Sequence, residues 1–311
     1  MQIVVTGASG FIGSQVLTLF NGHSVKTIGR TPIEKVSAHF TAHISPDTNY
    51  GDFFTNIDCV IHCAARVHVM DERSVSPIEE FRRSNVYSTL NLARQAAQAG
   101  VKRFIFLSTV KVNGEQTRSD NPFTETDLAN PKDPYGQSKF EAENGLIELA
   151  KRTGMDVVIL RPPLVYGPGV KGNMFSLLKL VDMGIPLPLD GIKNYRSMVS
   201  VDNLVSLIKV VTYHPKAANQ IFMVSDGDDL STSALVKGVA RGLNKRIWFL
   251  PIPVGLARVL LRLVGKEDLS TRLFDSLRVD ISKAKQLLSW EPPFSVEEGI
   301  QDMCKEFSRR D

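Results

Sequence analysis

Tyr135 and Lys139, in the segment "YGQSK", carry two side chains of this sequence that could move a proton together. Residues four apart lie on one face of an α-helix, so the phenol and the ammonium would project side by side. A free phenol has a pKa near ~10, and a neighbouring ammonium lowers that value because it favours the phenolate. The pair could therefore act as a general acid or base. The alternative is an ordinary exposed helix, where Tyr and Lys also occur at this spacing.

A glycine-rich segment, "TGASGFIG", could hold an anionic cofactor. Gly7, Gly10 and Gly13 lie between an expected strand and an expected helix. The first permits a tight turn, the second lets backbone N–H groups approach a pyrophosphate, and the third allows close packing of helix on strand. The spacing departs from the usual dinucleotide fingerprint, but the context of strand, loop and helix is complete. We therefore predict dinucleotide binding.

The residues after the second expected strand bear on the choice of cofactor. NAD binders usually present an Asp or Glu there to the ribose 2′-hydroxyl, whereas an Arg can accommodate a 2′-phosphate. This sequence reads "SVKTIGRTP", with Gly29 at the acidic position and Arg30 after it. NADP(H) is therefore favoured, with NAD(H) possible. The alternative is that Arg30 is a solvated loop cation.

The elements that must position these residues follow an alternating pattern. Strands are expected at "QIVVTG", "SVKTIG", "DCVIHCAA", "RFIFLSTV" and "DVVIL", and helices at "FRRSNVYSTLNLARQAAQAG" and from Tyr135 onward. Apolar runs without alternation indicate strands covered on both faces. The pattern predicts an α/β fold built on a parallel, doubly wound sheet.

Composition excludes several classes of protein. The chain of 311 residues has a net charge of +4 and no run of five or six like charges, so a nucleic-acid partner is not favoured, whereas an anionic small ligand is compatible. The 3 cysteines leave an odd count, which indicates reduced thiols and a cytoplasmic location. The 6 histidines lack metal-ligand spacing, so no metal is expected.

Two apolar segments of the sequence bear on membrane association. The N-terminal "MQIVVTGASG" has no basic region and no cleavage site, so no signal peptide is expected. The segment "IWFLPIPVGLARVLLRLVG" is interrupted by Pro251, Pro253, Arg258 and Arg262, so no integral membrane segment is expected. Its second half is expected to pack on the protein's own core; the alternative is a basic amphipathic helix on a membrane surface.

Four segments, "TGASGFIG", "HCAA" from His62, "FLSTVKVNG" and "YGQSK", together resemble the extended short-chain dehydrogenase/reductase superfamily, over essentially the whole chain. The resemblance implies a Rossmann-type domain, residues 1–165 with a return segment near 198–225, and a smaller nucleotide-sugar-binding domain, residues 166–197 and 226–311. It implies that Tyr135 is the catalytic tyrosine, that Lys139 lowers its pKa and holds the nicotinamide ribose, and that Thr109 orients the substrate oxygen in place of the usual Ser. The cofactor-binding residues implied are Gly7, Gly10, Phe11, Ile12, Gly13, Arg30, Ala64, Ala65, Asn85, Ser108, Tyr135, Lys139 and Pro162.

A longer similarity concerns the substrate. The segments "AARVHVMDE", "VKVNGE", "RPPLVYGPGVKGN" and "GIPLPL" resemble bacterial 4-reductases of UDP-2-acetamido-2,6-dideoxy-4-hexuloses, such as those that form UDP-N-acetylquinovosamine for surface polysaccharides. Many sugar 4-epimerases have an aromatic residue where Asn113 stands. The similarity implies that an NAD(P)H-dependent enzyme reduces the 4-keto group of a UDP-4-keto-6-deoxy-N-acetylhexosamine. The substrate-binding residues implied are Asn113, Asn173, Arg196 and Arg272.

Alternatives remain open for these residues and for the function. Arg196 could be a solvated surface charge and Asn173 a loop-capping amide. The protein could instead be a UDP-hexose 4-epimerase, acting on UDP-glucose or UDP-GlcNAc, that uses the same residues twice with tightly bound NAD, or an NADP-sensing scaffold without turnover. Two long helices often form a four-helix dimer interface in proteins of this family, so the resemblance also predicts a homodimer.

Overall fold

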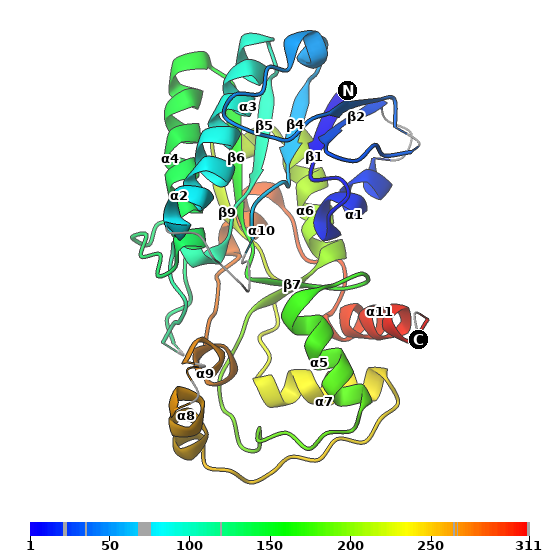
Figure 1. Ribbon diagram of the computed structural model, residues 1–311, viewed down its shortest axis with the longest axis vertical. Helices are drawn as coiled ribbons and strands as arrows, with labels where there is room; N and C mark the ends of the chain where they lie inside the picture. The colour runs from blue at the N-terminus through cyan, green and yellow to red at the C-terminus, as the bar shows by residue number, and fades with distance from the viewer. Residues whose placement is uncertain are drawn as a thin grey trace.

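Seven parallel strands form one sheet in the computed structural model, which describes residues 1–20, 24–34, 36–67, 76–118, 120–263, 265 and 267–309. Their order is β3-β2-β1-β4-β5-β6-β9, so the chain first winds outward from β1 and then returns to start the other half at β4 (Figure 1). This reversal between β1 and β4 is where doubly wound sheets bind ligands. The predicted α/β fold is confirmed. The strands are β1 Gln2–Thr6, β2 Ser24–Gly29, β3 Ala38–Thr41, β4 Cys59–His62, β5 Arg103–Leu107, β6 Asp156–Arg161 and β9 Ile221–Met223.

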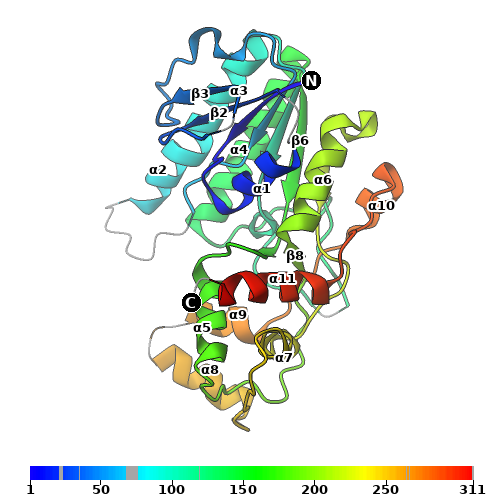
Figure 2. The ribbon, with the colours of Figure 1, turned by 90° about the vertical axis from the view of Figure 1, so that its right-hand side faces the viewer.

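Both faces of the sheet are covered, which explains why its central strands read as continuous apolar runs. Helices α3 (Ser88–Gln98) and α4 (Pro134–Thr153) pack on one face, over Val4, Val60 and Phe104. Helices α1 (Phe11–Leu19) and α6 (Val201–Tyr213) pack on the other face, over the alternate residues of the same strands (Figure 2). The sheet and its helices thereby hold the glycine loop and α4 in fixed positions.

Two elements differ from the sequence-based expectation. The single helix expected over residues 81–100 is α2 (Pro77–Phe81), then a π-helical turn η2 (Arg82–Tyr87), then α3. A π turn inserts an extra residue into the helical ladder, and apolar periodicity does not reveal it. The short edge strand β3 was not predicted, because "AHFT" has no long apolar run. Residues 68–72 of the segment "AARVHVMDE" lie outside the described residues.

A smaller region with its own apolar core lies beyond the carboxyl edge of the sheet. Its two-stranded sheet pairs β7 (Leu164–Tyr166) with β8 (Met198–Ser200) in parallel. The region also contains α5 (Gly172–Asp182), α7 (Thr232–Gly242), α8 (Val254–Leu263), α9 (Glu267–Phe274) and α11 (Val296–Ser308). Between α9 and α11 the chain returns to the large sheet as α10 (Ser282–Leu288), whose Ala284 and Leu288 pack with the core on the α1 and α6 face. The domain boundaries proposed from the sequence stay a prediction.

Buried polar contacts join the two regions. The hydroxyl of Tyr166 on β7 donates to Asp226 Oδ2 at 2.7 Å, and the other oxygen of Asp226 accepts from Asn203 Nδ2 on α6, also at 2.7 Å. Burial raises the pKa of Asp226, and the hydrogen bonds that its carboxylate accepts from Asn203, Tyr166 and Ser200 act in the opposite direction. Because buried polar groups are costly unless hydrogen-bonded, this set of contacts fixes the smaller region against the sheet.

Helix α8 only partly meets the expectation of packing on the protein's own core. Ala257 is buried in the core of the smaller region, whereas Leu256, Val259 and Leu263 are exposed. The side chains of residues 260 and 261, and residue 264 entirely, lie outside the described part. Among the described residues, no helix is both long enough and apolar enough to span a membrane.

Candidate active site

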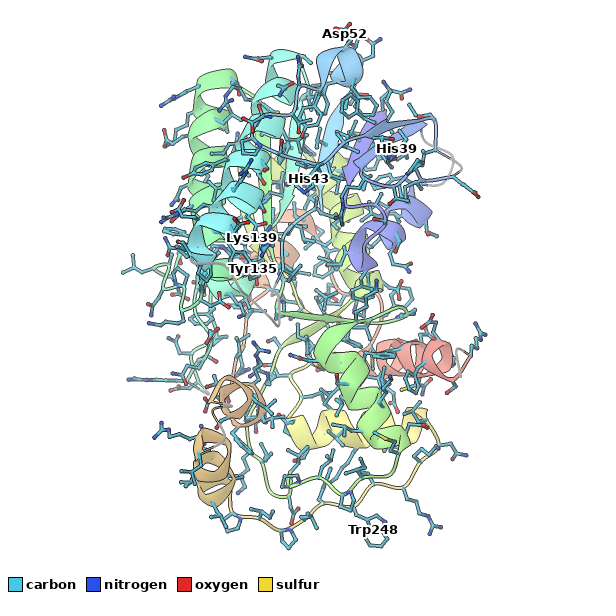
Figure 3. The ribbon with its side chains drawn as sticks, viewed as in Figure 1. His39, His43, Asp52, Tyr135, Lys139 and Trp248 are labelled. Atoms are coloured by element: carbon cyan, nitrogen blue, oxygen red, sulfur yellow. The ribbon has the colours of Figure 1, made fainter. Side chains whose placement is uncertain are left out.

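Tyr135 and Lys139 lie at the start of α4, at the carboxyl edge of the large sheet (Figure 3). Asp133 fixes the start of this helix, since its Oδ1 accepts from Gly136 N at 2.6 Å, and Pro134 suits the first helical turn. Tyr135 is therefore placed in the first turn and Lys139 one turn further along the same face. The helix expected from "YGQSK" is present.

Lys139 has an unusual environment for a cation. Its side chain is 1% exposed, and its Nζ lies 4.1 Å from the centre of the Phe106 ring. Burial lowers the pKa of Lys139 to about 7, while the negative charge of Glu143 acts in the opposite direction. No residue in the described part of the chain accepts a hydrogen bond from this ammonium. A buried donor of this kind fits the hydroxyl groups of a bound ribose.

Tyr135 does not have the lowered pKa that the resemblance implied. Burial raises the pKa of the Tyr135 phenol, and the negative charge of Asp133 adds to that shift. The ring contacts Phe81, with centroids 6.2 Å apart. In the protein alone, the apolar surroundings and the charge of Asp133 therefore favour the protonated phenol.

We expect the buried Lys139 to make folding pH-dependent. Between pH 7 and the ordinary Lys value near ~10.4, the unfolded chain holds a proton that the folded chain has lost, so stability rises with pH by up to about 1.4 kcal/mol per unit. Below pH 7 both states are protonated and the slope vanishes. Urea unfolding from pH 7 to 9.5, after removal of bound nucleotide, should show this rise in the wild type and not in Lys139→Met. The exposed Lys305→Met is the control, and a wild-type slope equal to that of Lys139→Met would contradict the assignment.

Thr109 and Ser108 end β5 beside α4. Thr109 Oγ1 accepts from Lys111 N at 3.3 Å and caps a short 3-10 turn, η3 (Val110–Val112). A Cβ atom on Gly136 would lie 2.9 Å from Lys111 O, so only glycine lets α4 approach this turn so closely. The close approach places Thr109 and Tyr135 at the same edge of the sheet. The Ser108 hydroxyl donates to Glu143.

A buried charged network, which the sequence reasoning did not identify, lies behind Thr109 and Tyr135. Arg161, at the end of β6, donates to Glu143 through Nε at 3.1 and 3.2 Å and through Nη2 at 2.6 Å. Its Nη1 donates to Asn113 Oδ1 at 3.0 Å, and Asn113 Nδ2 donates to Thr124 O at 3.0 Å. Glu143 lies four residues after Lys139, and that spacing could have indicated a third group on this helix face.

Asn113 therefore has a different place from the one expected. It is 2% exposed, and both ends of its amide are bound by protein groups. The expectation of direct sugar contact does not fit this burial. Asn113 instead fixes the chain after η3 to Arg161.

The glycine loop forms a tight turn against the end of β4. Gly7 has φ of +68°, and a Cβ atom there would lie 2.7 Å from Ala64 N. A Cβ on Gly13 would lie 2.2 Å from Gly7 O. The first turn of α1 contains Phe11 and Ile12 and no acidic residue. An uncrowded helix N-terminus of this kind, facing a glycine turn, suits a pyrophosphate.

The other residues expected at the cofactor lie around the glycine loop and α4, and Asn85 and Pro162 form hydrogen bonds that position the nearby backbone. Asn85, in the π turn, accepts from Arg66 N at 2.8 Å and donates to Arg66 O and to Ser138 Oγ, each at 3.0 Å. It thereby ties the segment after Ala64 and Ala65 to α4. Pro162 is buried, and its carbonyl accepts from Val110 N at 2.9 Å. Arg30 is exposed directly after β2.

Two arginines come together on the substrate side. Arg196 is half-buried and its Nη1 donates to Asp275 O at 2.9 Å. Burial lowers the pKa of Arg196, and the nearby positive charge of Arg272, in the last turn of α9, adds to that effect. Two guanidinium groups this close suit a diphosphate. Asn173 is exposed in the first turn of α5.

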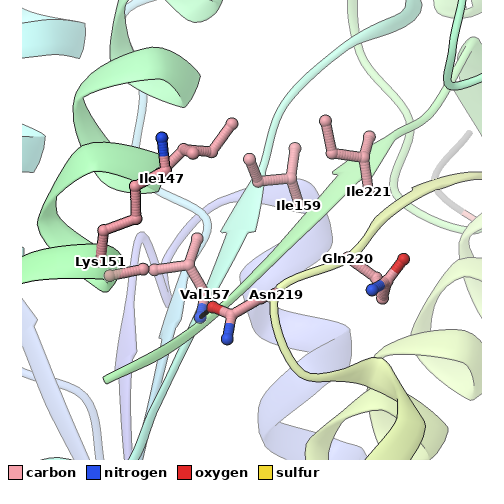
Figure 4. A pocket seen from close by; sticks show the side chains of 8 residues that line it. Ile147, Lys151, Val157, Ile159, Asn219, Gln220 and Ile221 are labelled. Atoms are coloured by element: carbon pink, nitrogen blue, oxygen red, sulfur yellow. Dashed lines mark hydrogen bonds between the residues drawn. The ribbon is translucent and has the colours of Figure 1, made fainter. Parts of the chain in front are cut away.

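A cavity of about 370 Å³ lies elsewhere, between the last turns of α4 and strands β6 and β9 (Figure 4). Its lining contains none of the residues expected at the site, so it does not locate the chemistry. Within the described ranges, no cluster of three or more His, Cys, Asp or Glu side chains could hold a metal ion. The lining residues are Ile147, Ala150, Lys151, Val157, Ile159, Asn219, Gln220 and Ile221.

A dinucleotide fits the edge formed by β1, β4 and α4. The glycine turn has no Cβ atoms, so its backbone N–H groups can approach a pyrophosphate closely. The buried ammonium of Lys139 can donate a hydrogen bond to a ribose hydroxyl. These features define a Rossmann-type enzyme that works with a bound dinucleotide. The chain belongs to the NAD dependent epimerase/dehydratase family, whose model matches residues 3–225. The resemblance to the extended short-chain dehydrogenase/reductases is thereby confirmed.

Similar proteins act on nucleotide sugars and on a lipid-linked sugar. The chain is 45% identical to a UDP-glucose 4-epimerase from Vibrio cholerae, over 98% of this chain and 95% of that protein. It is 31% identical, over 86% of this chain and 82% of the other, to an N-acetyl-α-D-glucosaminyl-diphospho-ditrans,octacis-undecaprenol 4-epimerase from Escherichia coli O157:H7. A UDP-glucose 4-epimerase from Thermotoga maritima, solved with UDP-glucose, superposes with a TM-score of 0.78 at 25% identity, covering 100% of this chain and 99% of that one. The 4-reductase subtype is not confirmed.

Proposed function

We propose that the protein is a UDP-hexose 4-epimerase that acts on UDP-glucose or UDP-N-acetylglucosamine with tightly bound NAD. The observation that carries the proposal is the 45% identity to a UDP-glucose 4-epimerase over 98% of the chain. The epimerase was the second hypothesis from the sequence. It now ranks ahead of the 4-keto reductase, because the full-length relatives named above are epimerases.

In the proposed reaction this chain supplies one acid/base group at a fixed place. A bound NAD would supply reversible hydride transfer at C4 of the sugar, with return to the opposite face. Tyr135 takes the proton of the 4-hydroxyl and afterwards returns it to the same oxygen. Thr109 donates a hydrogen bond to that oxygen and keeps it within reach of the phenol. Lys139 holds the cofactor ribose, and its charge favours the phenolate once the site is filled.

Arg196 and Arg272 would bind the diphosphate of the substrate. We expect Arg272→Gln to raise the KM for the UDP-sugar by about 10- to 100-fold, because charge-assisted hydrogen bonds contribute about 1.5–3 kcal/mol. The kcat should change by less than about threefold, since the diphosphate is remote from the reacting carbon. Steady-state kinetics would measure both. The control is the exposed Arg241→Gln, and an unchanged KM in Arg272→Gln would remove this residue from the site.

The test of the proposed function begins with the cofactor. Purified protein is denatured, and released nucleotide is identified as NAD or NADP by chromatography. Native protein is then incubated with UDP-glucose or UDP-N-acetylglucosamine without added cofactor, and the 4-epimer is quantified. Bound NAD together with conversion of either sugar is the expected result. Absence of conversion of both sugars, in protein that retains NAD, would overturn the proposal.

The 4-keto reductase remains the second candidate because of one feature. Arg30 is exposed directly after β2, and Gly29 offers no carboxylate, an arrangement that suits a 2′-phosphate. A reductase would consume added NADPH only when a UDP-4-keto sugar is present. The role in surface polysaccharide synthesis, the homodimer and the cytoplasmic location stay predictions from the sequence.

A further inference from the structure

A group of large apolar side chains is exposed at the end of the smaller region furthest from the sheet. Trp248 is 68% exposed and lies at this end of the long axis of the molecule (Figure 3). Leu263 is 77% exposed, and Leu256 and Val259 are exposed by 53% and 54%. Single exposed apolar residues need no explanation, but these lie within one segment, residues 248–263, at one end of the molecule (Figure 1). We call the set the Trp248 surface; its residues are Trp248, Leu250, Leu256, Val259 and Leu263.

The local backbone explains why Trp248 and Leu250 face outward. The chain here is extended and pairs with the segment after α5, through Leu187 N to Trp248 O at 3.0 Å and Leu250 N to Leu187 O at 2.9 Å. Side chains alternate along an extended segment, so Phe249 packs against the core of the smaller region while its two neighbours point the other way. The apolar core is thus already closed without them.

Helix α8 continues the same surface. Leu256, Val259 and Leu263 are spaced three and four residues apart, which places them along one stripe of the helix. Ala257 faces the core instead. Both views of the ribbon place α8 and the preceding extended segment together at the lower end of the molecule (Figures 1 and 2).

The charge of this segment has one sign. Between residues 241 and 263 the sequence contains no Asp or Glu and five cations, which are Arg241, Lys245, Arg246, Arg258 and Arg262. Arg246 and Arg262 are exposed. Lys245 contacts Asp182 at 3.0 Å, and Arg258 contacts Asp275 at 2.6 Å. Exposed apolar side chains flanked by cations, with an exposed Trp, complement an anionic lipid surface better than a neutral one.

We propose that the Trp248 surface docks peripherally on an anionic phospholipid bilayer. The apolar side chains enter the region between head groups and acyl chains, and the cations contact lipid phosphates. The proposal goes beyond the proposed function and stands whether or not the substrate is a UDP-sugar. It is supported by the similarity to an epimerase named for an undecaprenol-linked sugar.

The structure also connects the Trp248 surface to the diphosphate site. Arg258 on α8 binds the carboxylate of Asp275, and the backbone carbonyl of Asp275 accepts from Arg196. Asp275 thereby links α8, which carries the apolar stripe, to an arginine expected at the substrate diphosphate.

The full chain contains two Trp residues, which makes the test specific. Trp290 is buried and its Nε1 donates to Ser206 Oγ at 3.1 Å, so only Trp248 can enter a bilayer. With vesicles of phosphatidylglycerol and phosphatidylethanolamine, we expect co-sedimentation and a blue shift of Trp fluorescence. Both should weaken in 0.5 M salt and with phosphatidylcholine vesicles, since the lipid charge is then screened or absent.

A double substitution, Leu256→Glu/Val259→Glu, should lower the partition onto anionic vesicles by at least about tenfold, because it places charges in the apolar stripe. The control is Leu128→Glu, at an exposed loop position far from α8 along the chain. Loss of binding in the double variant, with unchanged conversion of soluble UDP-sugars, would support docking as a separate property.

Two results would overturn the proposal. One is binding of the wild type to anionic vesicles no stronger than that of the double variant. The other is a mass in solution that falls to that of a monomer only in the double variant, since the Trp248 surface would then be covered by a second copy of the chain.

Discussion

Replacing Tyr135 by Phe should lower kcat by about 10²- to 10⁴-fold, the usual contribution of a positioned general acid or base. Phe keeps the ring and its contact with Phe81 and removes only the hydroxyl, so folding and cofactor retention should persist. The KM for the UDP-sugar should change by less than about threefold. The Tyr135 hydroxyl acts in the proton-transfer step and does not bind the substrate diphosphate. Epimerisation assays with saturating substrate would measure the loss.

The exposed Tyr213→Phe provides the matched control, since it makes the same chemical change at the end of α6. A Tyr135→Phe protein with at least a tenth of wild-type kcat would exclude this tyrosine as the proton-transfer group. If that variant also retained the full biological effect, the scaffold hypothesis would gain support. Thermal unfolding of both variants separates chemistry from stability.

Replacing Glu143 by Leu should destabilise the protein by about 3–5 kcal/mol, the range measured when one partner of a buried ion pair is removed. The guanidinium of Arg161, which is 4% exposed in the wild type, would then lose the carboxylate oxygens that accept its hydrogen bonds. The Ser108 hydroxyl would lose the same acceptor. Arg161→Met should destabilise by a similar amount. The double variant Glu143→Leu/Arg161→Met should lose clearly less than the sum, because no uncompensated charge remains.

The surface pair Glu148 and Lys151 provides the comparison for this double-mutant cycle. Its nitrogen and oxygen lie 2.6 Å apart, but both side chains are more than half exposed, so the coupling should be much weaker than that of the buried pair. Urea unfolding gives each value. Equal coupling in both cycles would show that the buried network adds no more than a surface pair.

Glu143 is also expected to act on the chemistry as a positioning residue. The negative charge of Glu143 raises the pKa of Lys139 against the effect of burial. Without Glu143 the pKa of Lys139 should fall further, so the free energy of unfolding should begin to rise at a lower pH than in the wild type. This shift distinguishes an electrostatic role from simple loss of packing. The conservative Glu143→Gln should show the same shift with a smaller loss of stability.

The sequence was sufficient to predict the sheet and the pair on α4, for identifiable reasons. Strands buried on both faces have long apolar runs, and Tyr135 and Lys139 are near in the chain, so local spacing determines their proximity. The loop after β1 could be predicted from three glycines because turn geometry is also local. The residue-by-residue roles at the cofactor remain predictions that the variants above would test.

The remaining features depend on contacts between distant segments. Arg161 meets Asn113 across 48 residues of chain, and nothing local to "KVNGE" indicates that the amide of Asn113 is buried. The π turn around Asn85 is set by its contacts with Arg66 and Ser138 rather than by apolar periodicity. For α8 the sequence left two alternatives, packing on the core or an exposed amphipathic helix, because an amphipathic pattern does not indicate which surface the apolar side will meet.

The position of β9 has a consequence for how the protein is made. This outer strand pairs with β6, yet about 60 residues separate the two, and the smaller region's β7, α5 and β8 are synthesised between them. Helix α6, which covers one face of the sheet, is also synthesised within that interval, after β8. During translation the large sheet therefore keeps one apolar face without α6 until Tyr213 has left the ribosome, and keeps the edge at β6 open until Met223 has left it. The nascent chain is most vulnerable to aggregation over this interval, and it is there that a chaperone would have the most to protect.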